Sequence, residues 1–125
     1  MRSISDKSLI VISLETYSVV SRLLDYSVRT NSPIIKLHDI ELKVFREDIK
    51  SLYLDVHFNN VSYNFSFHNN GWISISEDAE GTRRERFSMG FYRDDHNFTY
   101  NGDRDFCLEV CEQLIDIINS GFNFN

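Results

Sequence analysis

Polar and apolar side chains alternate along residues 51–76, and this alternation predicts the centre of the fold. In residues 51–58 and again in 61–68 every second side chain is apolar, which places those side chains on one face of a β-sheet. A two-residue turn at residues 59–60 would set apolar side chains opposite one another along the whole hairpin, and Asn tolerates the positive φ that this turn needs. The expected pairs are Phe58 with Val61, Val56 with Tyr63, Leu54 with Phe65 and Leu52 with Phe67.

The next turn predicts a second hairpin with a different loop. A three-residue loop at residues 69–71, with Gly71 in the left-handed conformation, would pair Phe67 with Ile73 and keep apolar side chains opposite one another. A two-residue loop would instead place Ser74 on the apolar face. The longer loop is therefore favoured.

Helical spacing of apolar residues predicts one helix before this sheet and another after it. The first covers at least residues 14–29, whereas residues 8–13 are β-branched enough to form either a strand or the first helical turns. Pro33 ends this helix, because proline disfavours helical backbone in the residue before it. In the second helix, Asp103 is a good N-cap and Gly121 is the expected C-terminal cap.

Further extended segments complete the sheet on both sides of the central strands. Residues 34–46 alternate as a strand does, residues 84–92 form another, and Phe98 and Tyr100 lie in a short last one. In the 84–92 strand the expected core face comprises Phe87, Met89 and Phe91, and the solvent face Arg84, Arg86 and Ser88. We expect one α+β domain over residues 1–125, a single-layer antiparallel β-meander of five or six strands packed with an N-terminal and a C-terminal α-helix.

The last helix has two contrasting faces. One is apolar, and on the opposite one four carboxylates fall within about 60° of one another at 100° per residue. We call this set the acidic stripe, and it comprises Asp105, Glu109, Glu112 and Asp116. Leu108 and Ile115 widen the apolar arc beyond what one sheet contact needs. This flank is expected to meet either the N-terminal helix or a second protein.

The acidic stripe predicts a surface that docks on a basic partner. A solvated helix face is the alternative interpretation, although like charges four residues apart slightly disfavour a helix. Residues 77–81 are expected to form an acidic loop whose Glu77, Asp78 and Glu80 extend the same contact.

Charge and cysteine usage narrow the class of partner. The formal net charge of −6 over 125 residues argues against direct binding of nucleic acid, which depends on Lys and Arg. No apolar stretch approaches the roughly 20 residues of a membrane span. Cys107 and Cys111, four residues apart on the apolar face of the last helix, indicate reduced buried thiols and hence a cytoplasmic location.

Candidate catalytic and metal-binding residues each have a simpler interpretation. Cys107 and Cys111 could supply two zinc ligands, but the scattered histidines offer no second ligand pair. Asp94, Asp95 and His96 combine carboxylate and imidazole, yet neighbours in an extended segment point opposite ways, so a polar turn is favoured. The sequence contains no phosphate-binding loop and no nucleophile motif. We expect no catalytic residue, no cofactor and no metal.

Two further groups of side chains bear on recognition. Arg83, Arg84 and Arg86 form a basic cluster that is expected to pair across strands with acidic residues. On the sheet face opposite the phenylalanines the pattern places Tyr53, His57, His68 and Trp72. This face is either a recognition surface, since Tyr and Trp concentrate at interfaces, or is covered by the N-terminal helix.

Together these observations favour a function as a non-enzymatic protein-binding domain. The leading hypothesis is a small acidic inhibitor or immunity-type protein of a bacterium or phage. It would occlude a basic surface of a toxin, a nuclease or a nucleic-acid-binding effector. One alternative is a homodimeric chaperone or adaptor with Leu108 and Ile115 at its seam, and another is an enzyme or ligand-binding module that uses Asp95 and His96. Both a monomer and a homodimer are compatible with the sequence.

Overall fold

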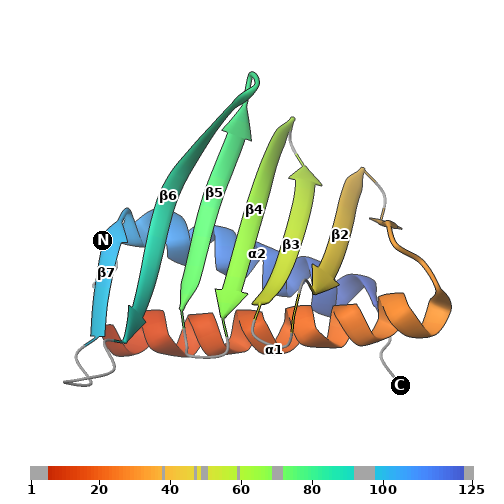
Figure 1. Cartoon of the computed structure of the whole chain (residues 1–125), viewed down its shortest axis with the longest axis horizontal. Coiled ribbons are helices and arrows are strands. Elements are labelled where there is room, and N and C mark those ends of the chain that lie inside the picture. The colour runs from red at the N-terminus through yellow and green to blue at the C-terminus, as the bar shows by residue number, and fades with distance from the viewer. Residues whose placement is uncertain are drawn as a thin grey trace.

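The computed structural model describes residues 6–37, 39–46, 48, 51–58, 60–68, 72–91 and 98–122. Along the chain, one helix precedes the seven strands and a second helix follows them (Figure 1). The elements are α1 (Asp6–Thr30), β1 (Ile35–Leu37), β2 (Ile40–Arg46), β3 (Ser51–Phe58), β4 (Val61–His68), β5 (Ile73–Ala79), β6 (Thr82–Phe91), β7 (Phe98–Gly102) and α2 (Arg104–Gly121).

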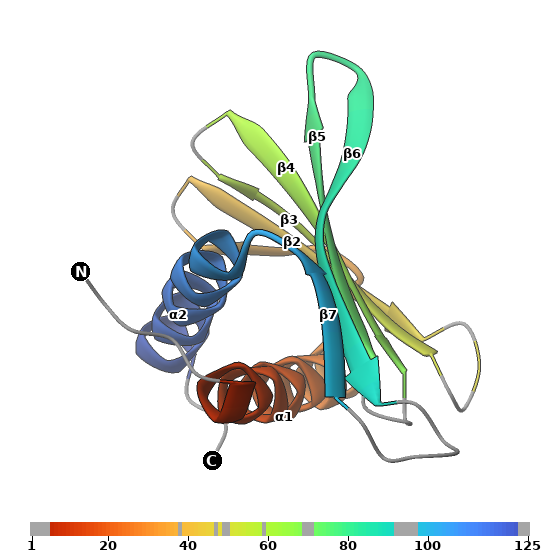
Figure 2. The same ribbon diagram turned by 90° about the vertical axis from the view of Figure 1, so that its left-hand side faces the viewer.

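The strands form one antiparallel sheet in which each strand pairs with its neighbours in sequence, from β1 to β7. Both helices lie on the same face of this sheet and pack against each other (Figure 2). Ring contacts confirm the placement, because Tyr17 of α1 lies 5.8 Å from Phe67 and Phe106 of α2 lies 6.0 Å from Tyr63, centroid to centroid. The expected α+β class with a helix at each end is confirmed. The expected count of five or six strands is wrong, because the sheet has seven.

The additional strand comes from residues 34–46, which the sequence presented as one extended segment. The chain reverses at Asp39, so that Leu37 of β1 pairs with Ile40 of β2. Apolar positions change from odd to even numbers between Leu37 and Ile40, and a change of parity also occurs across the two-residue turn at residues 59–60. This change of parity is the sequence signal of the turn.

The register of the two central hairpins is confirmed. All the expected pairs between β3 and β4 occur, and Asn60 has the positive φ, 63°, that the turn requires. Phe67 pairs with Ile73, as the three-residue loop predicts. Residue 59 and the 69–71 loop themselves lie outside the described residues.

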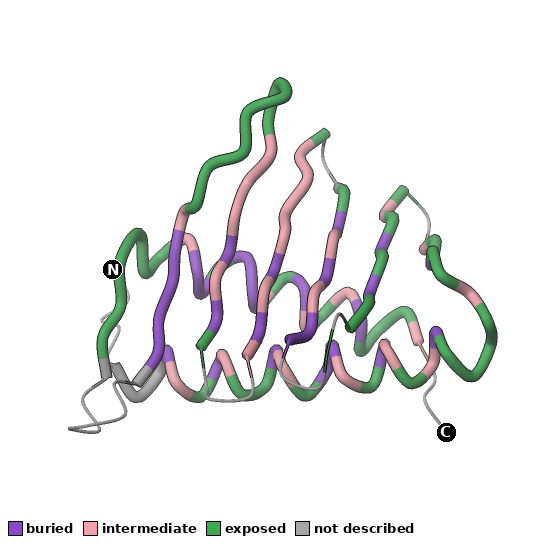
Figure 3. Tube along the Cα trace, in the orientation of Figure 1, coloured by how far each residue is buried: buried purple, intermediate pink, exposed green. Residues whose placement is uncertain are grey.

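The core lies between the sheet and the two helices. Figure 3 shows buried residues where the strands cross the helices and exposed ones toward the tip of the β5–β6 hairpin. Leu9 is fully buried and Ile12 is 8% exposed, so residues 8–13 extend α1 and add to this core. Helical spacing therefore outweighs the β-propensity of this segment. No helix among the described residues combines the length and apolarity needed to cross a bilayer.

The two capping residues of α2 are Asp103 at its N-terminus and Phe122 at its C-terminus. Asp103 is the N-cap, as expected, and its carboxylate accepts a hydrogen bond from the Phe106 N–H at 3.1 Å. Gly121 is the last helical residue rather than the cap, which is Phe122. A Cβ at Gly121 would lie 2.0 Å from Leu37 Cδ2, so this glycine allows β1 to approach the helix closely.

Residues 77–81 do not form the expected acidic loop. Glu77 and Asp78 belong to β5, and the hairpin turns at Glu80 and Gly81, which have φ angles of 56° and 81°. Positive φ at both central residues matches the twist of the paired strands and gives a tight turn. Acidic residues are uncommon in strands, but these two lie opposite arginines of β6.

Candidate functional site

The acidic stripe lies along the solvent side of α2. Asp105, Glu109 and Asp116 are exposed and Glu112 is half-buried. The other side of the helix packs into the core, so the apolar and acidic residues lie on opposite faces, with Glu112 at the boundary between them. The basic residue of α2 is Arg104 in the first turn, and its guanidinium carbon lies 5.3 Å from the centroid of the Tyr100 ring.

The exposed carboxylates of this stripe are not neutralised by the rest of the described chain. Asp105, Glu109 and Asp116 form no ion pair with another described residue. Within α2, four carboxylates against one guanidinium leave a formal charge of −3. A helix surface of this kind attracts a positively charged partner and repels a negatively charged one.

Glu77 lies on the same side of the molecule as α2. Its carboxylate pairs with the Arg86 guanidinium, whose carbon lies 4.1 Å from the centroid of the Phe106 ring. Burial raises the pKa of Tyr63 in this cluster, and the Glu77 carboxylate raises that pKa further. Arg86 opposes this shift, and Glu109 adds to it. The carboxylates of Glu77 and of Glu109 in the acidic stripe therefore lie close enough to act on the same side chain.

A β-bulge places Arg86 on the helix side of the sheet. Ile75 pairs with Phe87, but Ser76 pairs with Glu85, so Arg86 is one residue more than β5 can match. Its side chain therefore points to the same side as Phe87. The expectation that Arg86 faces solvent was wrong, because strict alternation does not continue through a bulge.

The other two acidic residues of this segment lie elsewhere. Asp78 is on the opposite face of the sheet, next to Arg83 in the pairing of β5 with β6, and Glu80 is exposed at the hairpin turn. The arginine cluster is thus divided in the same way as the acidic residues. A partner that lies on α2 would face Glu77 but not Asp78.

Leu108 and Ile115 are placed within the single chain. Leu108 is 6% exposed and belongs to the core, and Ile115 is half-buried against it. Because α1 and α2 pack together, the wide apolar arc of α2 is used by the chain itself. Leu108 consequently offers no exposed seam to a second copy.

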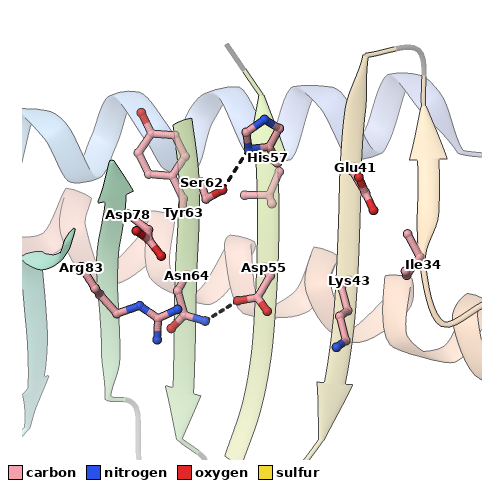
Figure 4. A pocket seen from close by; sticks show the side chains of 11 residues that line it. Ile34, Glu41, Lys43, Asp55, His57, Ser62, Tyr63, Asn64, Asp78 and Arg83 are labelled. Atoms are coloured by element: carbon pink, nitrogen blue, oxygen red, sulfur yellow. Dashed lines mark hydrogen bonds between the residues drawn. The ribbon is translucent and has the colours of Figure 1, made fainter. Parts of the chain in front are cut away.

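The sheet face away from the helices, which we call the outer face, is not covered by α1 or α2 (Figure 2). This placement answers the question left open for Tyr53, His57, His68 and Trp72, since the N-terminal helix packs on the other side. The outer face contains a shallow depression of about 280 Å³. Its charged lining residues are Glu41, Lys43, Asp55, Asp78 and Arg83 (Figure 4).

Neighbouring strands place hydrogen-bonding groups across the floor of this depression. His57 Nδ1 lies 2.9 Å from Ser62 Oγ, and the Asn64 amide donates to the Asp55 carboxylate. In Figure 4 the guanidinium of Arg83 reaches from β6 toward Asn64. Both signs of charge are present, so the depression suits a polar surface of mixed charge. Sequence reasoning missed it because four strands contribute its charged residues, and only their register brings these together.

The remaining candidates for chemistry have structural explanations or lie outside the description. Within the described ranges no group of three or more His, Cys, Asp or Glu is placed to hold a metal ion. Residues 94–96 and His38 lie outside those ranges. Cys107 and Cys111 are fully buried thiols, and the hydrogen bond between them, with burial, raises the pKa of Cys107. The same hydrogen bond lowers the pKa of Cys111. A thiol that stays protonated, as Cys107 does, is a poor nucleophile and a poor metal ligand.

No protein-family model, no curated protein and no solved structure matches this chain.

Proposed function

We propose that this protein is a non-enzymatic, protein-binding domain of the inhibitor or immunity type. It would bind and occlude a basic surface of a toxin, a nuclease or a nucleic-acid-binding effector. The observation that carries the proposal is the acidic stripe, because three of its carboxylates are exposed and form no ion pair within the described chain.

The way α2 is held supports a role in recognition. Six of its side chains are buried, and its first turn is capped by Asp103, so the stripe is presented on a rigid support. A preorganised surface loses little conformational entropy on binding, which favours affinity. Occlusion would then be steric, while the stripe would accelerate association and compete with phosphate for the basic surface.

The acidic residues of the β5–β6 hairpin lie on both faces of the sheet, which limits how many of them a partner bound to α2 could contact. Glu77 lies beside the first turns of α2 and would sit at the rim of the interface, where it remains paired with Arg86. Glu80 lies at the tip of the hairpin, and Asp78 faces away from α2. We therefore centre the proposed contact on the acidic stripe. Reduced thiols in the core support a cytoplasmic site for this interaction.

The first test is capture of the partner on immobilised protein at low ionic strength, followed by elution with a salt gradient. An interaction dominated by exposed charges weakens steeply as salt rises. We expect one basic protein in stoichiometric amount, released at moderate salt and absent when Asp105→Asn, Glu109→Gln and Asp116→Asn are combined. Capture that is unchanged in this variant would refute the role of the acidic stripe.

A further inference from the structure

Side chains on the outer face form rows that cross the strands from β2 to β6, and the pairing of the strands fixes the order within each row. The first row comprises Glu41, His57, Ser62, Asp78 and Arg83. The second row comprises Lys43, Asp55, Asn64, Ser76 and Glu85. The third row comprises Phe45, Tyr53, Ser66, Ser74 and Ser88.

These rows are self-complementary about the middle strand. Consider two copies with their outer faces together, related by a two-fold axis that runs along β4. Each row then lies on the same row of the second copy, with β2 facing β6 and β3 facing β5. Sheets that pack in this aligned way keep their strand directions within about 30° of each other. The contact is isologous, so every pairing occurs twice.

Opposite charges meet in the first two rows of this arrangement. Glu41 faces Arg83 of the second copy, and Lys43 faces Glu85. No two like charges face each other, because Asp55 meets the neutral Ser76. Symmetry doubles both pairings, which gives four ion pairs across the interface. Within the described part of the single chain, Glu41, Lys43 and Arg83 form no ion pair.

Large side chains meet small ones in the third row. Tyr53 faces Ser74 of the second copy, and Phe45 faces Ser88. The rings of Phe45 and Tyr53 are stacked 5.2 Å apart, and Phe45 is 38% exposed although it is strongly apolar. The partly exposed Ser74 leaves room opposite Tyr53, whereas Ser88 is only 6% exposed, so the fit in shape rests on the pairing of Tyr53 with Ser74.

The size of the outer face is also compatible with a dimer. Five strands about 4.8 Å apart and rows about 7 Å apart give a flat footprint of roughly 500 Å². Specific interfaces bury about 800 Å² of accessible surface per partner. Because protruding side chains add surface, the accessible area of the outer face is larger than this flat footprint. In Figure 2 the far part of the β5–β6 hairpin bends away from the helices. In the dimer each hairpin would therefore contact the β2 edge of the other copy and add to the buried area. The acidic stripe of α2, by contrast, repels another copy of itself.

We propose that the protein forms a homodimer through its outer face, with the two-fold axis along β4 and with Glu41 and Lys43 of one copy paired to Arg83 and Glu85 of the other. The acidic stripe then remains exposed on both outer sides of the dimer. This proposal does not depend on the proposed function, because it concerns a different face and a second copy of the same chain.

A charge exchange tests this dimer. Wild type is expected to sediment as a concentration-dependent dimer, and Glu41→Arg is expected to raise its dissociation constant at least about tenfold, because it sets two guanidinium groups against each other at both ends. Arg83→Glu should have the same effect by bringing two carboxylates together. Combining both substitutions restores opposite charges and should return the dissociation constant to within about threefold of wild type.

The control variant is Glu15→Arg, which makes the same change in net charge at an exposed position of α1 and should leave dimerisation unchanged. Far-ultraviolet circular dichroism establishes that each variant is folded. A wild type that stays monomeric at high concentration would overturn the proposal. So would a dimer that tolerates each single reversal, or one that the double exchange fails to restore.

Discussion

The guanidinium of Arg86 lies over the ring of Phe106, with its carbon 4.1 Å from the ring centroid, and it also pairs with Glu77. Arg86 is the additional residue of the β5–β6 bulge, and Phe106 lies in the first turn of α2. This contact joins the hairpin to the start of the helix that carries the acidic stripe. The positive charge of Arg86 also offsets the repulsion between the carboxylates of Glu77 and Glu109, which both lie near Tyr63.

Arg86→Ala is expected to lower the free energy of unfolding by about 1–2 kcal/mol, through loss of a cation–π contact and a partly buried ion pair. Urea denaturation of the purified protein measures this change. Arg84→Ala is the matched control, because Arg84 is exposed on the same strand and should change stability by less than about 0.5 kcal/mol. Equal effects of the two substitutions would show that the Phe106 contact contributes nothing specific.

Gly102 is expected to be far more sensitive to substitution than Gly81, although both have positive φ. A Cβ at Gly102 would lie 2.3 Å from the Arg86 carbonyl oxygen, whereas one at Gly81 meets no atom within 4 Å. Gly81→Ala should therefore cost about 1 kcal/mol for its backbone conformation alone. Gly102→Ala should exceed that by about 2 kcal/mol or more, because backbone atoms must move. Thermal unfolding of the two variants would contradict this account if their midpoints agreed.

Stability is expected to fall as the pH rises above about 8.5, the ordinary pKa of a thiol. Its hydrogen bond with Cys111 and burial raise the pKa of Cys107, so the folded chain keeps a proton that the unfolded chain loses. The unfolded chain then binds fewer protons, and the free energy of unfolding decreases by up to about 1.4 kcal/mol per pH unit. The same hydrogen bond lowers the pKa of Cys111, so the two thiols titrate as a pair. Cys107→Ala combined with Cys111→Ala should flatten this slope between pH 8 and about 9.5, below the ordinary tyrosine pKa. Denaturation curves measured over this range with reductant present test this prediction. An unchanged slope in the double variant would exclude the two thiols as its cause.

Much of the fold could be predicted because alternation and turn chemistry agree. The hairpin register followed from opposing apolar residues on both sides of residues 59–60, and a one-residue slip would expose half of them. Asp103 was predictable as an N-cap because its short carboxylate can reach the N–H groups of the first helical turn. These are local rules, and neighbours in sequence are enough to apply them.

What the sequence could not provide depends on contacts between distant segments. The bulge at Arg86 breaks alternation for the sake of a contact with Phe106, twenty residues later. The outer-face depression joins Glu41 and Arg83 through the register of five strands, so an error in any one strand would have hidden it. The acidic stripe was visible because one helix carries it, whereas the assignment of Glu77 and Asp78 to opposite faces required the sheet.

We propose that the acidic stripe, rather than the net charge of the protein, binds a basic partner. Two variants with equal net charge separate these possibilities, because each neutralises three exposed carboxylates and changes the formal charge from −6 to −3. One combines Asp105→Asn, Glu109→Gln and Asp116→Asn, and the other combines Glu15→Gln, Asp25→Asn and Asp39→Asn. The decisive measurement is calorimetric titration of each variant with the captured partner at a fixed low salt concentration. We expect the stripe variant to lose at least about a hundredfold in affinity and the control variant less than about threefold. Equal losses in the two variants, or no loss in the stripe variant, would exclude the acidic stripe as the binding surface.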